Sequence, residues 1–277
     1  MRKLIFGVGA VVYALTITGA NAADLRRPLY KAPSPPPSWS WTGFYLGANL
    51  GYSWGRSNTD INLVGADALL AVNFVANRSF GMNGVIGGGQ LGYNLQNGIW
   101  VLGLEADIQA SGQKGSAAFT CALVCSSGDA ADEVRNVSGI FEQRLDWFGT
   151  LRGRLGLAAG PAVMPYVTGG LAYGGIKTSG TLSGVTVGGL PTSTTFGPNR
   201  VTRTGWTVGA GIEALLGGGW TVRLEYLYLD LGTVSTIAAL STNAPPLTTT
   251  FQSRITDNIA RIGINYLFGD GPVMAKY

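Results

Sequence analysis

The sequence contains no histidine and only two cysteines among its 277 residues. Histidine is the usual general base of Ser-His-Asp sites, and two thiols without histidine do not complete a zinc site. These absences argue against hydrolases of that type and against a metal centre. We therefore expect no enzyme activity, no cofactor and no metal.

Charge is scarce as well, since only 12% of the residues are charged. Soluble domains carry about twice that fraction. The formal net charge of +4 is too small for a nucleic-acid-binding surface, so no nucleic acid is expected as a partner. No stretch after residue 22 reaches the roughly 18 apolar residues that a spanning helix requires, which argues against a helical membrane protein.

The first 40 residues predict export. Arg2 and Lys3 precede an apolar run over 4–17, and Ala20-Asn21-Ala22 has the small-residue pattern of a cleavage site, so residues 1–22 are expected to be a cleaved signal peptide. Residues 23–40 are rich in proline and are expected to form an extended polyproline II leader in the periplasm.

Export also bears on the cysteines. Cys121 and Cys125 lie close together in one expected loop, and an oxidising compartment favours a local disulfide between them over free thiols. The ring would be short, so its effect on global stability is expected to be small.

From residue 41 onward the chain alternates apolar and other residues in segments that are separated by connections of two lengths. The expected strands are 42–54, 83–95, 99–111, 143–158, 164–176, 203–216, 220–231 and 256–268. Three connections are short and glycine-containing, at 96–98, 160–161 and 217–219, whereas 55–82, 112–142, 177–202 and 232–255 are long. Short turns at one end and long loops at the other predict an all-β, eight-stranded antiparallel up-and-down transmembrane barrel over 41–268, with a tail over 269–277.

The two faces of the strands decide what surrounds such a barrel. In the last strand, Ile262, Ile264 and Tyr266 alternate with Arg261 and Asn265. A soluble barrel of the lipocalin kind would place the apolar row inside, which would leave the charged row in water. A row of Leu, Ile and Trp on the outer face suits lipid and not water, so we expect the apolar row to face the membrane and the charged row to face the lumen.

The expected lumen charges are five acids and five arginines. They are Glu105, Asp107, Asp146, Glu213 and Glu225 with Arg144, Arg152, Arg154, Arg223 and Arg261. Balanced charges in a narrow lumen should pair, which predicts a structural plug; a lumen wide enough to conduct small solutes is the alternative. Glu105 and Asp107 could serve as an acid/base pair, but their arginine-rich surroundings favour ion pairing.

Aromatic residues on the apolar faces fall near both ends of the expected strands, as two interfacial girdles would. The periplasmic set is Phe44, Tyr93, Trp100, Trp220, Tyr266 and Phe268, and the outer set is Tyr52, Trp54, Trp147, Tyr173, Trp206 and Tyr228. Gly87 to Gly92 matches the dinucleotide-binding pattern G-x-G-x-x-G, but lies inside a strand, where glycine instead relieves crowding.

Three segments resemble a known family: residues 23–28, the run from Trp39 to Tyr52, and the ending from Arg261 to Phe268 with residues 273–277. They are similar to the outer-membrane immunogenic proteins of alphaproteobacteria, barrels related in architecture to OmpA and OmpX. The resemblance implies an outer-membrane location, no catalytic residue, and assembly by the barrel assembly machinery through a C-terminal aromatic. Phe268 and Tyr277 both suit that role.

Members of the family are described as surface antigens, envelope-stabilising proteins, porin-like proteins or haemin binders. We therefore expect a structural surface protein of the outer membrane, with a narrow porin-like channel as the alternative and haemin binding by outer loops as a third hypothesis. Expected partners are outer-membrane lipid and lipopolysaccharide, and host or environmental ligands at the loops. Residues 67–74 suggest a short helix or strand extension, and 181–187 a projecting hairpin.

Overall fold

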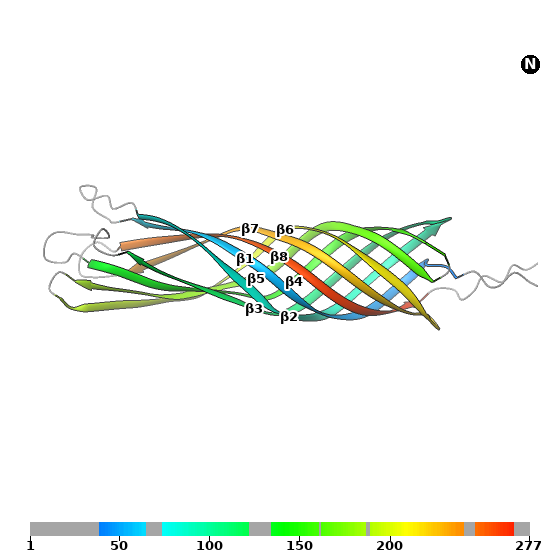
Figure 1. Cartoon of the computed structure of the whole chain (residues 1–277), viewed down its shortest axis with the longest axis horizontal. Helices are drawn as coiled ribbons and strands as arrows, with labels where there is room; N and C mark the ends of the chain where they lie inside the picture. The colour runs from blue at the N-terminus through cyan, green and yellow to red at the C-terminus, as the bar shows by residue number, and fades with distance from the viewer. Residues whose placement is uncertain are drawn as a thin grey trace, which may run out of the picture. The chain divides into compact units, whose positions relative to one another are not determined.

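A computed structural model of the chain describes residues 39–64, 74–121, 134–160, 162–186, 189–240 and 247–268. Within these ranges eight antiparallel strands form a closed barrel, in which each strand pairs with the next along the chain and β8 pairs with β1 (Figure 1). The strands are β1 (Gly43–Val64), β2 (Phe74–Asn97), β3 (Trp100–Cys121), β4 (Val134–Leu157), β5 (Val163–Thr186), β6 (Pro191–Gly217), β7 (Trp220–Leu240) and β8 (Leu247–Phe268). The predicted up-and-down barrel is confirmed.

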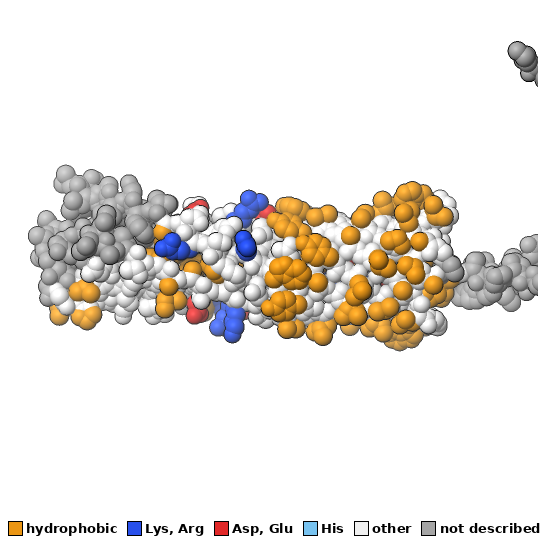
Figure 2. Space-filling view, in the orientation of Figure 1, with side chains coloured by type: hydrophobic (Ala, Val, Ile, Leu, Met, Phe, Trp, Pro, Cys, Tyr) orange, Lys and Arg blue, Asp and Glu red, His pale blue; other side chains and the backbone are white. Residues whose placement is uncertain are grey.

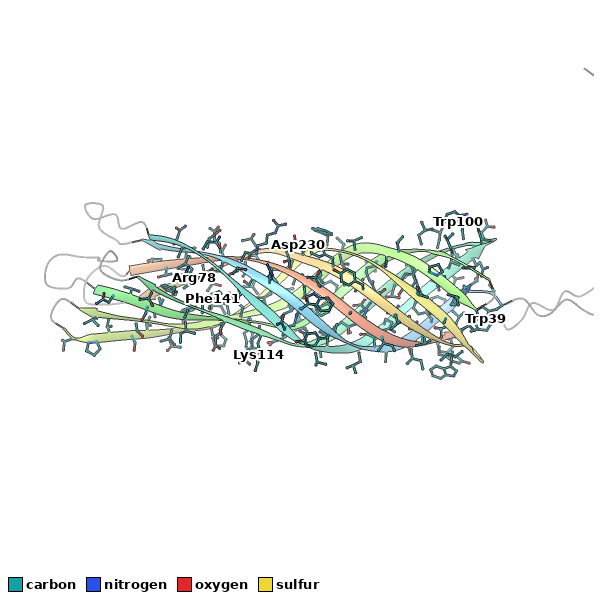
Figure 3. All side chains as sticks on the ribbon, in the orientation of Figure 1. Trp39, Arg78, Trp100, Lys114, Phe141 and Asp230 are labelled. Atoms are coloured by element: carbon teal, nitrogen blue, oxygen red, sulfur yellow. The ribbon has the colours of Figure 1, made fainter. Side chains whose placement is uncertain are left out.

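Short connections join the strands at one end of the barrel, the end where Trp39 and Trp100 are labelled in Figure 3. Residues 98–99 form a two-residue turn between β2 and β3, and residues 158–162 join β4 to β5. Between β6 and β7, Gly218 and Gly219 have φ angles of 59° and 86°, in the left-handed region that favours glycine. All three reversals lie at the turns that the sequence predicts.

The other ends of the strands differ from the prediction. Residues 55–64 continue β1 and residues 74–82 belong to β2, so most of the expected loop 55–82 is sheet. The strand bounds leave only 65–73, 122–133, 187–190 and 241–246 between strands at this end. The expectation of four long loops is therefore wrong for most of their length. The expected hairpin is observed where residues 181–185 pair with 191–195, whereas residues 67–73 and 187 lie outside the described part of the chain.

The predicted strands ended too early because the inward and outward faces of the sheet exchange polarity halfway along the barrel. On β8, the outward residues change from Gln252 and Arg254 to Ile262 and Ile264 towards the short-turn end. The inward residues change in the opposite sense, from apolar side chains such as Ile255 to Arg261. Alternation thus continues through the whole strand, but the part beyond the membrane has the pattern of a water-soluble barrel.

The outward apolar side chains form a belt on the short-turn half of the barrel (Figure 2). Aromatic contacts mark both of its edges. Ring centroids lie 4.6 Å apart for Phe44 and Tyr93 and 5.1 Å apart for Trp220 and Tyr266 at one edge. At the other edge are the pairs Trp54–Tyr226 at 6.4 Å, Trp147–Tyr173 at 6.1 Å and Trp206–Tyr228 at 5.4 Å. About ten residues of each strand lie between the edges, enough for a tilted strand to cross the hydrocarbon layer.

The interior is filled in layers. A small apolar cluster of Trp41, Val101 and Met164 lies at the short-turn end, and a charged layer follows it. Two larger apolar clusters fill the remainder, one around Phe148 and Ile259 and one around Phe141. Among the described residues, no helix is long and apolar enough to cross a membrane.

Candidate functional site

The charged layer occupies the interior of the membrane-crossing half and is built from four arginines and four carboxylates. Its members are Glu105 and Asp107 from β3, Arg152 and Arg154 from β4, Glu213 from β6, Arg223 and Glu225 from β7, and Arg261 from β8, each at most 4% exposed. We call this set the ionic network. All eight were predicted to face the lumen, because strand alternation places them on the face opposite the apolar belt.

Arg152 is the centre of the larger part of the ionic network. Its Nη2 donates to Oδ2 of Asp107 over 2.9 Å and also to Glu105, and its Nη1 donates to Oε1 of Glu225 over 3.1 Å. Arg261 reaches the same acids from β8, with 3.1 Å between its Nη2 and Asp107 Oδ2 and 2.6 Å between its Nε and Glu225 Oε2. Arg223 donates to Glu105 from β7. One cluster of charges therefore joins β3, β4, β7 and β8 across the lumen.

The smaller part is the ion pair between Arg154 and Glu213. Thr221 donates its hydroxyl hydrogen to Glu213, and Nδ2 of Asn265 donates to Oε1 of the same carboxylate over 2.9 Å. The guanidinium carbon of Arg154 lies 3.7 Å from the ring centroid of Tyr166, within the range of a cation–π contact. Glu213 thus receives a balancing charge and neutral hydrogen-bond donors.

Two buried tyrosines, which were not among the predicted site residues, donate hydrogen bonds to the ionic network. Tyr45 donates to Oε2 of Glu105 over 2.6 Å, and Tyr166 donates to Oε1 of Glu225 over 2.9 Å. Both lie on the inward face of their strands, so the same alternation that identified the charges could have identified them. Buried tyrosine hydroxyls usually find a partner, and these two help to satisfy the carboxylates.

Arg144 and Asp146 were predicted to face the lumen, and this prediction is wrong. Both are exposed on the outer wall, whereas Leu145 between them is buried. The β4–β5 register shifts between Leu145 and Trp147, which places Asp146 and Trp147 on the same outer face and reverses the alternation above this bulge. Asp146 Oδ2 lies 3.7 Å from Nζ of Lys177 on the outside.

A further buried acid, Asp257, was missed. It lies on β8 one residue above the outer aromatic edge, where it accepts hydrogen bonds from Ser53 and, over 2.7 Å, from Nε2 of Gln113. Burial raises the pKa of Asp257 from 3.8 to about 6, because these two neutral donors only partly offset the cost of desolvating the charge. Asp257 lies on the same inward face of β8 as Arg261, four residues away. This even spacing could have identified Asp257 as a lumen residue from the sequence.

Above the charges, aromatic rings fill the barrel. The ring of Phe251 stacks on Phe141 at a centroid distance of 4.7 Å and on Phe196 at 5.4 Å, and Phe119 meets it edge-on at 6.2 Å. Phe141 is labelled in Figure 3 in the half of the barrel away from the short turns. The interior therefore holds a charged layer and apolar layers in series, an arrangement suited to filling space and connecting strands.

The remaining predicted residues lie at or beyond the limits of the described chain. Phe268 ends β8 with its ring exposed and 4.8 Å from that of Tyr266, whereas Tyr277 lies outside the described residues. Cys125 also lies outside them, as does the side chain of Cys121, so the disulfide stays a prediction. Within the described ranges, no three acidic or cysteine side chains gather as a metal site.

Comparisons with known proteins agree with this architecture. A family model described as the outer membrane protein beta-barrel domain matches residues 10–268. A 31 kDa outer-membrane immunogenic protein of Brucella melitensis is 35% identical over 264 residues, which cover 94% of this chain and 98% of that protein. A 22 kDa outer membrane protein of Rhizobium leguminosarum is 33% identical over 240 residues, covering 83% of this chain and 86% of that protein.

Among solved structures, the outer membrane protein OprG from Pseudomonas aeruginosa is similar with a TM-score of 0.44 and 14% identity, covering 83% of this chain and 97% of that one. The family model spans all eight strands of the barrel, and the Brucella relative aligns along almost its full length. The chain therefore belongs to the outer-membrane β-barrel protein family and is a protein of the bacterial outer membrane, homologous to the Brucella outer-membrane immunogenic proteins.

Proposed function

We propose that the protein is a non-conducting structural barrel, which anchors a rigid surface extension in the outer membrane and contributes to the integrity of the envelope. The observation that carries this proposal is the ionic network, whose eight charged side chains balance and are at most 4% exposed. An eight-stranded barrel is just wide enough for its own side chains to fill. A solute would have to separate Arg152 and Arg261 from three carboxylates at one level of the lumen.

The apolar layers above the network support the same proposal. A hydrated ion entering from outside meets the stacked rings of Phe141, Phe196 and Phe251 before it reaches the charges. Transfer of a charge into such surroundings without a compensating partner is costly. Two barriers of opposite chemistry in series are poorly suited to the passage of either polar or apolar solutes.

A narrow channel is the second candidate, and one observation favours it. Three buried arginine nitrogens have no hydrogen-bond partner among the described residues: Nη1 of Arg154, Nη2 of Arg223 and Nη1 of Arg261. Buried donors of this kind are places where water or a small anion can bind. A chain of such donors would favour anions over cations.

Planar-bilayer recording of the refolded mature chain tests the proposal. We expect no conductance steps above leak from the wild type, because the charged layer and the apolar clusters occupy the lumen in series. Reproducible steps that change in Arg152→Ala and not in Arg144→Ala would establish the channel instead. Arg144 is the matched control, since it is the same residue type on the same strand but points outward.

The proposed structural role does not exclude contacts at the cell surface. Haemin binding at the outer connections stays a hypothesis from resemblance, and without histidine the iron ligand would have to be tyrosine, methionine or cysteine. An unchanged Soret band during titration of haemin with the refolded chain would remove it.

A further inference from the structure

Four basic residues stand side by side on the outer wall, on four consecutive strands. Lys114 of β3 pairs with Arg144 of β4, Arg144 pairs with Lys177 of β5, and Lys177 pairs with Arg200 of β6. We call Lys114, Arg144, Lys177 and Arg200 the basic row. All four face outward, Lys177 half-buried and the others exposed, and Lys114 is labelled on the wall in Figure 3.

Like charges placed directly opposite each other destabilise a sheet, so the basic row calls for an explanation. The acids near it compensate only in part. Asp146 lies 3.7 Å from Lys177, and Glu142 is exposed two residues from Arg144. Within the described parts of the chain, Lys114, Arg144 and Arg200 form no ion pair at all, so the row keeps an excess of positive charge.

The surface around the basic row is hollowed in two places. One hollow of about 370 Å³ is lined by Lys114, Ser116, Glu142 and Arg144. A second, of about 320 Å³, is lined by Asp146, Trp147, Lys177, Arg200 and Thr202. Each hollow offers two cations and a hydroxyl group, which suit phosphate oxygens, against a single carboxylate, Glu142 or Asp146, which opposes them.

The position of the basic row identifies the source of the phosphate. Trp147, which lines the second hollow, belongs to the outer aromatic edge of the apolar belt through its contact with Tyr173. Figure 2 shows basic side chains directly beside the apolar belt on the visible face. A ligand held there would have acyl chains along the belt and its head group at the row, which is the orientation of an outer-leaflet lipid.

We propose that the basic row binds the phosphates of a phosphorylated glycolipid of the outer leaflet, the lipid A part of lipopolysaccharide. Neighbouring strands lie about 4.8 Å apart, so the row extends over about 14 Å of wall and can contact more than one phosphate of a single head group. Lys114, Arg144 and Arg200 are all exposed and unpaired, and the two arginines are the principal ligands because a guanidinium can bind two phosphate oxygens at once. Lys177 is also paired with Asp146, so it contributes less.

The test uses the full refolded barrel in neutral detergent, with bisphosphorylated lipid A, monophosphorylated lipid A and inorganic phosphate as probes. Native mass spectrometry measures the bound fraction of each probe. We expect affinity to fall in that order, and Arg144→Ser with Arg200→Ser to weaken binding of bisphosphorylated lipid A about tenfold or more. Arg144→Lys with Arg200→Lys should retain most of the binding.

The control is Arg56→Ser with Arg78→Ser, which removes the same charge from two exposed sites on β1 and β2, away from the row. It should change the affinity less than about twofold. Heat-dependent electrophoretic mobility verifies that each variant is folded. Equal losses in control and row variants, unchanged binding in the row variant, or inorganic phosphate binding as tightly as lipid A would each overturn the proposal.

Discussion

Asp107 accepts a hydrogen bond from Arg152 although the two residues are not partners in the β3–β4 register. Asp107 is paired with Thr150, and Arg152 is paired with Glu105, yet Nη2 of Arg152 lies 2.9 Å from Asp107 Oδ2 and also binds Glu105. One guanidinium therefore bridges two acids on one face of β3. Because Glu225 of β7 contacts the other Nη atom, Arg152 connects opposite walls of the barrel.

Replacing Arg152 with alanine should destabilise the barrel strongly. The change leaves Glu105 and Asp107 buried with fewer balancing charges, and breaking a buried ion pair by removing one partner costs about 3–5 kcal/mol. Urea unfolding of the chain in lipid vesicles, followed by tryptophan fluorescence, measures the loss.

Arg144→Ala is the control for this prediction. Its exposed side chain forms no ion pair within the described ranges, so the free energy of unfolding should change by no more than about 0.5 kcal/mol. If the two variants unfold at the same urea concentration, the ionic network does not contribute to the stability of the folded barrel.

Asp257 should make the barrel more stable in mild acid than at neutral pH. Its pKa is about 6 in the folded chain against 3.8 ordinarily, so the folded state binds the proton more tightly. The free energy of unfolding contributed by this residue should therefore decline by about 3 kcal/mol as the pH rises from about 4 to about 6, and stay level above that.

Asp257→Asn provides the comparison, because asparagine keeps the shape and can still bond Ser53 and Gln113 but does not titrate. Urea midpoints of the wild type and the variant, measured from pH 4 to pH 8, should differ in slope only below about pH 6. Parallel profiles would show that Asp257 titrates normally in the folded barrel.

Gly92 should tolerate no side chain. A Cβ atom there would meet the ring of Tyr45 and lie 2.6 Å from the carbonyl oxygen of Leu104, so Gly92→Ala should displace Tyr45 from Glu105. We expect a loss of about 1–3 kcal/mol in the free energy of unfolding. Gly89→Ala on the same strand is the control, since its Cβ would meet only Gly47 O at 3.6 Å, and equal losses would contradict the account.

Much of the fold was predictable because one physical rule governs the membrane-crossing half. Lipid on one side and a narrow lumen on the other enforce alternation, so residues such as Ile262 and Arg261 indicate their faces from sequence alone. The outer half was missed because its alternation has the opposite sense. Phe251 and Ile255 lie on the same inward face of β8 as Arg261. A pattern that requires apolar residues on the outward face therefore fails over residues 247–255, and this segment was predicted to be a loop.

The site was predictable to the same extent and for the same reason. Parity identified the eight members of the ionic network, but parity fails at a bulge, and nothing local in the sequence around Asp146 indicates one. The basic row could not be predicted from the sequence either, because its pairing depends on bulges. Its members pair across four strands, and their register depends on that bulge and on the bulge between Ala110 and Gln113.

Single-cysteine labelling along β8 tests most directly whether a filled barrel crosses the membrane. The native cysteines are first replaced by serine, and one cysteine is then introduced at a time. Position 252 reports the outer surface, position 259 the interior, and position 262 the lipid-facing wall. With an impermeant maleimide on intact cells, we expect labelling at position 252 only, and equal labelling at all three after boiling in SDS. Rapid labelling at position 259 would show an open lumen, and rapid labelling at position 262 would show that the apolar belt faces water.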